Sequence, residues 1–130
     1  MVSAKSYSSY KDTQIKTASP MALIILLYDG VLKNIQKGMA GLREEDGFKE
    51  SATHLLKAGA IVTELMSIIN PSVSPKLATG LSASYQHVLR LISEASKQQD
   101  PAPLMKAVEI ISSLRSAWLE VAQKSERQVV

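Results

Sequence analysis

Apolar residues recur every three or four positions over most of this chain, in four stretches separated by short polar breaks. That spacing places the apolar side chains of each stretch along one face of an α-helix. The alternation of apolar and polar residues that is typical of strands does not appear. We therefore predict an all-α fold, an antiparallel four-helix bundle with short loops. The predicted helices span residues 20–42, 48–69, 75–97 and 101–124.

Local signals place the ends of these helices. Ser19-Pro20, Ser74-Pro75 and Asp100-Pro101 each combine a residue that caps a helix N-terminus with a proline, which is tolerated at the first helical position. Asp46-Gly47 breaks the chain between the first and second helices. Asn70-Pro71 ends the second helix, because the residue before a proline avoids the α conformation.

Each predicted helix offers a line of apolar residues to the core. These lines are Ile24, Tyr28, Val31, Ile35 and Met39 in the first helix; Leu55, Gly59, Val62, Met66 and Ile69 in the second; Leu77, Leu81, Val88, Leu91, Ile92 and Ala95 in the third; and Leu104, Val108, Ile111, Leu114, Trp118 and Ala122 in the fourth.

Apolar residues cover roughly half the circumference of the second helix, more than the usual stripe of a little over ~100°. We expect neighbouring helices to cover Leu65. Ile61 and Ile68 are equally consistent with burial between helices and with a groove for a partner.

The first helix is apolar all round where it begins. Leu23 and Leu26 point away from its core line, so either residues 1–19 or a partner must cover them. We predict that residues 1–19 form a cap or gate segment, extended or briefly helical, ahead of a bundle over residues 20–125. We expect residues 126–130 to form a frayed tail.

Composition narrows the class of protein. With 130 residues, 45% of them apolar and 21% charged, the chain is sized for one globular domain. The absence of cysteine excludes disulfides and thiolate metal sites. The net charge of +3 comes from scattered lysines, which does not favour nucleic acid as a partner. Residues 1–20 lack the order of a signal peptide, and Met21–Leu27 is far shorter than the ~20 residues of a membrane-spanning helix, so we expect neither secretion by that route nor stable membrane insertion.

Candidate catalytic groups are few. His54 is followed by Lys57 and Gly59, close to the pattern of histidine phosphotransfer domains, which are also four-helix bundles and use an exposed imidazole as nucleophile. In that family the glycine lies one position earlier, and so short a pattern arises easily by chance. His54 and His87 have no carboxylate partners placed to hold a metal. We predict no enzyme activity, metal or cofactor, with phosphotransfer through His54 as the alternative function.

A longer motif lies between Tyr10 and Gly30. It runs Tyr-Lys-Asp-Thr-Gln-Ile-Lys-Thr-Ala-Ser-Pro and, after two residues, Leu-Ile-Ile-Leu-Leu-Tyr-Asp-Gly. This motif closely resembles the N-terminal signature of flagellar secretion chaperones for flagellin, the FliS family. The chain length, the four helices and the late Trp118 also match, so the resemblance covers most of the chain.

The resemblance implies a cytoplasmic, all-helical chaperone without catalysis or cofactor. Such chaperones bind the C-terminal helical region of newly made flagellin, prevent its premature polymerisation and deliver it to the export gate of the flagellar type III apparatus. Flagellin and the export gate are therefore the expected partners. The sequence leaves open which flagellin is bound and whether the protein forms a homodimer when free of its client.

The resemblance also indicates partner-binding residues. In the family, the segment before the first helix lies over the client groove and bears on docking at the export gate. The residues of this chain that match the motif there are Tyr10, Thr13, Gln14 and Ile15. Leu23 and Leu26 would form part of the surface that this segment covers. A permanent cap that only completes the core is the alternative.

We expect the client surface itself on the second helix and at the start of the third. The predicted contacts are Ile61, Ile68, Leu77 and Tyr85. The third helix departs from the family's pattern, because Tyr85 keeps the first tyrosine of a family run whereas His87 replaces the second.

Overall fold

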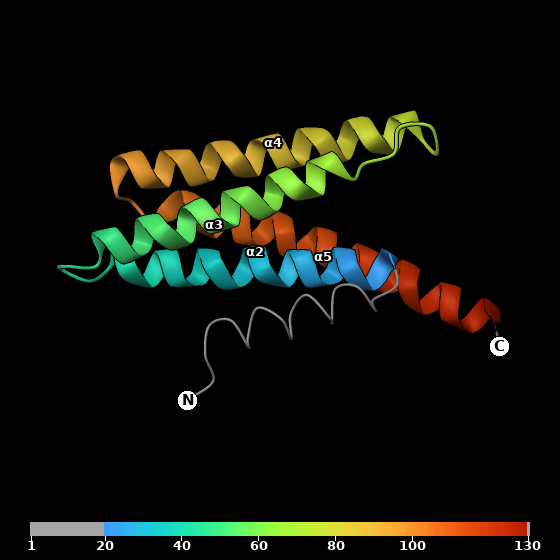
Figure 1. The fold of residues 1–130 in the computed structure, drawn as a ribbon, viewed down its shortest axis with the longest axis horizontal. Coiled ribbons are helices and arrows are strands. Elements are labelled where there is room, and N and C mark those ends of the chain that lie inside the picture. The colour runs from blue at the N-terminus through green and yellow to red at the C-terminus, as the bar shows by residue number, and fades with distance from the viewer. Residues whose placement is uncertain (1–19, 130) are drawn as a thin grey trace, which may run out of the picture.

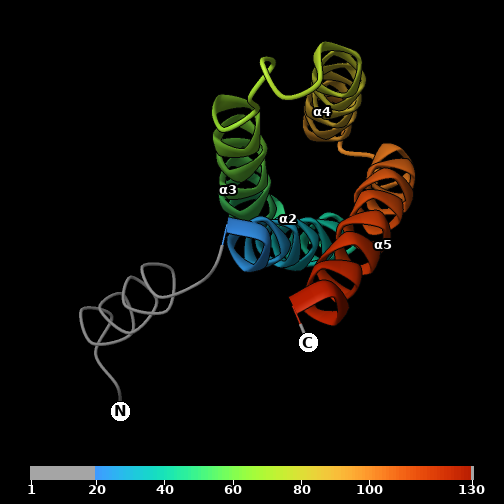
Figure 2. The same cartoon turned by 90° about the vertical axis from the view of Figure 1, so that its right-hand side faces the viewer.

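The computed structural model of the chain describes residues 20–129, with side chains described as far as Lys124. Successive helices run in opposite directions, and α5 returns beside α2 (Figure 1). Seen nearly end on, the helices form a ring in which α2 and α4 each lie between α3 and α5 (Figure 2). The predicted all-α antiparallel four-helix bundle is thus confirmed. Its helices are α2 (Pro20–Leu42), α3 (Phe48–Ser67), α4 (Pro75–Gln98) and α5 (Ala102–Val129).

The helix boundaries follow the local signals closely. The Ser74 hydroxyl accepts a hydrogen bond from the backbone N–H of Leu77 at 3.2 Å, so Ser74 caps α4 as predicted. The Asp100 carboxylate accepts one from the N–H of Ala102 at 3.0 Å, and α5 begins there, one residue later than predicted. Three predicted ends differ: α3 ends at Ser67, α4 at Gln98 and α5 at Val129 rather than at residues 69, 97 and 124.

The core runs along the axis of the ring and takes residues from all four helices. Its fully or nearly buried members are Tyr28, Val31, Ile35, Leu55, Ala58, Val62, Leu65, Tyr85, Val88, Ile92, Ala95, Leu104, Ala107 and Ile111. On α3 the predicted core line is corrected, because Ala58 and Leu65 are buried while Gly59 and Met66 are only partly buried. The expectation that neighbours cover Leu65 is confirmed. Leu77, predicted for the core, is 54% exposed in the first turn of α4.

The α2–α3 end of the bundle is packed through small residues. The Ser51 hydroxyl donates to the Gly38 carbonyl at 2.8 Å and is buried with it. A Cβ atom on Gly38 would lie 2.5 Å from Cδ2 of Leu55, and one on Gly41 would lie 2.8 Å from Cβ of Ser51. Side chains larger than hydrogen do not fit here without movement. This tight end lies opposite the end at which α3 passes into α4, where the bundle is open (Figure 1).

Candidate interaction surface

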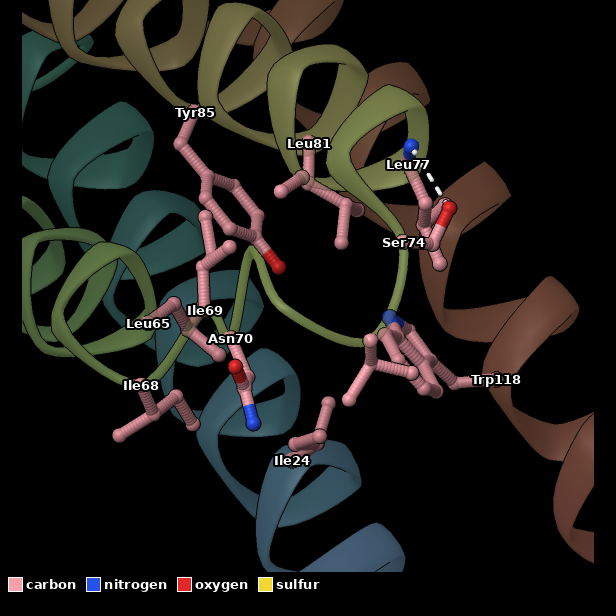
Figure 3. Close-up of a pocket in the computed structure, with 12 residues that line it drawn as sticks. Ile24, Leu65, Ile68, Ile69, Asn70, Ser74, Leu77, Leu81, Tyr85 and Trp118 are labelled. Atoms are coloured by element: carbon pink, nitrogen blue, oxygen red, sulfur yellow. Dashed lines mark hydrogen bonds between the residues drawn. The ribbon is translucent and has the colours of Figure 1, made fainter.

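An apolar pocket of about 220 Å³ lies at the end of the bundle where α3 leads into α4 (Figure 3). All four helices and the α3–α4 loop contribute to its wall. The lining residues are Ile24 of α2; Leu65 of α3; Ile68, Ile69, Asn70, Val73 and Ser74 after it; Leu77, Ala78, Leu81 and Tyr85 of α4; and Trp118 of α5. No charged side chain is among them, so the pocket suits an apolar group.

Three large apolar side chains on the rim of this pocket are exposed to solvent. Ile68 is 43% exposed, Leu77 54% and Val73 79%. Single exposed apolar residues are normal on a protein surface, but these three converge on one concavity. Their convergence marks the bundle end as a surface that a partner can bury.

The inner wall of the pocket is held by a hydrogen-bond chain across three helices. The hydroxyl of Tyr85, on α4, lies 2.6 Å from the hydroxyl of Tyr28, on α2. The indole N–H of Trp118, on α5, donates to the same Tyr28 oxygen at 2.7 Å. Burial raises the pKa of both phenols, and for Tyr28 the two hydrogen bonds offset part of that rise. Both phenols are therefore neutral at physiological pH and leave no charge beneath the pocket.

The Tyr-Asp-Gly end of the N-terminal motif has a structural explanation. Its tyrosine, Tyr28, forms the hydrogen bonds described above. Asp29 accepts a hydrogen bond from Nε of Arg115 at 2.5 Å, which ties α2 to α5. A Cβ atom on Gly30 would lie 3.0 Å from Cδ1 of Ile61, so the glycine lets α3 approach closely. The tripeptide thus contacts all three other described helices: Tyr28 bonds to α4 and α5, Asp29 bonds to α5, and Gly30 packs against α3.

The structure brings three of the four predicted client contacts together. Ile68, Leu77 and Tyr85 all line the end pocket, although only Ile68 and Leu77 are open to solvent. Tyr85 is 2% exposed and belongs to the core, so it supports the pocket wall from inside. Ile61 lies elsewhere, partly buried between α3 and α2. A role in partner binding stays a prediction for all four.

The predicted contacts near the N-terminus are only partly described. Leu23 and Leu26 are half-buried on α2 and are not among the residues that line the pocket. The remaining contacts, Tyr10, Thr13, Gln14 and Ile15, lie outside the described residues.

Sequence reasoning missed part of the pocket. Val73 was overlooked because it belongs to the short connection between two prolines, where no helical period applies. Ile24, Ile69 and Trp118 were assigned to the core alone, but they also form the pocket wall. The clustering of apolar residues around Pro71 and Pro75 is the signal that could have found this site.

The alternative site at His54 lacks the geometry that phosphotransfer needs. Nδ1 of its imidazole lies 3.1 Å from Oδ1 of Asn34, and Nε2 lies 4.0 Å from Oε1 of Glu50. The side chain is 15% exposed, whereas a phosphoryl acceptor must present a free ring nitrogen to solvent. Within residues 20–124, no group of three His, Asp or Glu side chains is placed to hold a metal ion. No helix of the described chain is long and apolar enough to cross a membrane.

The sequence is similar to a family of known proteins. Residues 3–125 match the sequence model of the family described as Flagellar protein FliS. The flagellar secretion chaperone FliS of Bacillus subtilis is 29% identical over 122 residues, which cover 94% of this chain and 89% of that protein. The protein of the same name from Campylobacter jejuni is 26% identical, covering 88% of this chain and 89% of its own length. That of Vibrio cholerae is 27% identical, with 85% and 80% covered.

Proposed function

The chain belongs to the FliS family of flagellar secretion chaperones, and we propose that it binds the C-terminal helical region of flagellin in the cytoplasm, keeps it from polymerising and delivers it to the flagellar export gate. The observation that carries this proposal is the apolar pocket at the open end of the bundle, with Ile68, Val73 and Leu77 exposed on its rim. A chaperone acts by binding alone, so the protein needs no catalytic group, metal or cofactor. Phosphotransfer through His54 finds no support.

Occupancy explains how binding would prevent polymerisation. The terminal region of flagellin is apolar and unfolded in the monomer, and it is also the surface by which subunits assemble. Burial of its apolar side chains in the end pocket would stabilise the complex by about 25 cal/mol for each Å² removed from water. Ordering the segment opposes binding, so a large contact area is required. While that area is covered by the chaperone, it is closed to other flagellin subunits.

The segment before α2 has a second role in this proposal, in the delivery of the client. We propose that Tyr10, Thr13, Gln14 and Ile15 cover part of the client surface in the free protein and take part in docking at the export gate. The half-buried Leu23 and Leu26 lie at the start of α2, where this segment joins the bundle. The family resemblance of the motif supports this role.

A titration of the purified protein with the C-terminal segment of its own organism's flagellin tests the proposal. We expect saturable binding with one segment per chaperone. Leu77→Asp should weaken that binding about tenfold or more, because it places a charge on an apolar rim. Leu56→Asp is the matched control, since Leu56 is 76% exposed on α3 and does not line the pocket. Absence of wild-type binding at tens of micromolar, or equal effects of the two variants, would contradict the proposal.

A further inference from the structure

The end pocket opens into a longer groove between α4 and α5. Ser74, Leu77 and Leu81 line the end pocket and also a second concavity, whose far wall is Leu114 of α5. Ser84 lines this second concavity and also a third, farther along the same two helices. The three concavities therefore follow one another from the open end of the bundle towards its middle.

The chemistry of the groove changes along its length. The end pocket is walled mainly by apolar side chains. Leu77, Leu81 and Leu114 line the second concavity together with small residues, and Lys76 is the one charged residue among its lining residues. The third concavity is instead lined by three basic side chains, His87 and Arg90 of α4 and Lys106 of α5. Thus an apolar half at the open end is followed by a basic half near the middle of the bundle.

The positive charge of the basic half is only partly neutralised by the chain itself. Nζ of Lys106 lies 3.4 Å from Oε2 of Glu109, so this carboxylate offsets part of the lysine's charge, although both side chains are well exposed and the pair is screened by solvent. Among the side chains that the structure describes, no carboxylate forms an ion pair with Arg90. A negatively charged group is therefore the natural complement of this part of the groove.

We propose that the α4–α5 groove binds a client helix with apolar side chains at one end and acidic side chains at the other. This inference rests on the proposed function, because the client is the protein whose segment enters the end pocket. Arg90 lies 13 positions after Leu77 on α4, which is roughly 20 Å at about 1.5 Å per residue. The acidic side chains of a helix lying along the groove are expected about that far from its apolar anchor.

The segment that precedes α2 is a poor match for the basic half. Residues 1–19 contain Lys5, Lys11 and Lys16 against the single carboxylate of Asp12. Like charges would meet if this segment extended to Arg90 and Lys106. The basic half thus favours an acidic partner over the chain's own N-terminus, and its charges fix the direction in which that partner lies.

Charge reversal in the groove tests this inference with the same flagellin segment as the probe. The variant Arg90→Glu/Lys106→Glu should raise the Kd about tenfold and reverse its dependence on salt concentration, because salt then screens a repulsion instead of an attraction. The control Lys49→Glu/Lys57→Glu changes the net charge equally at exposed positions of α3 outside the groove, and it should leave the Kd within about twofold. Arg90→Gln/Lys106→Gln, which removes charge without reversing it, should give an intermediate Kd.

The outcomes separate this inference from the proposed function. If the wild type binds and Leu77→Asp weakens binding while the charge reversal does not, the acidic client is ruled out and the chaperone function stands. If the wild type does not bind the segment, the proposed function itself fails. One further occupant of the basic half is the acidic loop Glu44–Asp46 of a second copy of this chain. Sedimentation equilibrium of the client-free protein tests whether such a dimer forms. A dimer that the charge reversal dissociates would overturn the inference in favour of self-association.

Discussion

The hydroxyl oxygens of Tyr28 and Tyr85 lie 2.6 Å apart in the core, although the two tyrosines are 57 positions apart in the sequence. Trp118 donates to the same Tyr28 oxygen, so one hydroxyl joins α2, α4 and α5. Tyr85 and Trp118 also line the end pocket, which makes this bond chain the support of the candidate binding surface. Its disruption should therefore affect both stability and client binding.

Tyr28→Phe should lower the free energy of unfolding by about 1 to 3 kcal/mol, because it leaves the Tyr85 hydroxyl and the Trp118 N–H without their partner. Tyr85→Phe should cost less, since Trp118 can still donate to Tyr28. Urea unfolding followed by Trp118 fluorescence measures both variants. A smaller effect of Tyr28→Phe than of Tyr85→Phe would contradict the arrangement.

Stability should fall at alkaline pH because of the buried Tyr28–Tyr85 pair. Burial raises the pKa of both phenols above the ordinary value of 10.0, so the folded state holds their protons more tightly than the unfolded state. The stabilising contribution is complete below pH 10 and is lost as the pH rises above it. The variant Tyr28→Phe/Tyr85→Phe should show a shallower decline between about pH 10 and 11. Equal slopes for variant and wild type would argue against the buried pair as the cause.

Two glycine substitutions should have opposite effects. Gly38→Ala should destabilise the protein by about 1 to 3 kcal/mol, because its Cβ atom would overlap Leu55. Gly80→Ala, on an exposed face of α4 with no atom within 4 Å of the new Cβ, should stabilise it by about 0.5 to 1 kcal/mol. Thermal unfolding of both variants tests the close packing of α2 on α3. Absence of destabilisation by Gly38→Ala would refute this packing, and destabilisation by Gly80→Ala would refute the open surroundings of Gly80.

The C-terminus of α4 is strained at Gln99. This residue adopts the left-handed conformation with φ of 52°, and its N–H donates to the Ala95 carbonyl. Gln99→Gly should raise the melting temperature by removing a strain of about 1 kcal/mol. Gln98→Gly, one position earlier in the helix, should lower the melting temperature. The two variants make the same Gln-to-Gly replacement, so a shift of the melting temperature in the same direction for both would count against the explanation.

The segment before α2 should act in export rather than in folding. We expect Tyr10→Ala/Ile15→Ala to leave the melting temperature of the bundle within about 2 °C, because α2 to α5 pack a core of their own within the described part of the chain. Secretion of flagellin by cells carrying the variant should fall. Normal secretion together with normal binding of flagellin would remove these two residues from the mechanism.

The sequence alone determined the number and type of the helices in the described part of the chain, and it placed all their boundaries except the end of α5 to within two residues. These features depend on local chemistry: a serine that caps α4, prolines at or near helix starts, and an apolar residue every three or four positions. The same local patterns placed Tyr28, Val31 and Ile35 in the core, because a narrow apolar stripe leaves only one face to bury.

Tertiary structure decided which of the remaining apolar residues face a neighbour and which face solvent. Helical spacing gives the direction of a side chain but not where the facing helix ends, so Leu77 was assigned both to the core and to the client surface, and only the tertiary structure places it on the open rim. Tyr85 appeared available to a partner, yet the hydroxyl of Tyr28 holds it inside. The end pocket and the basic half of the groove likewise arise only where residues distant in the sequence meet, which no local pattern can specify.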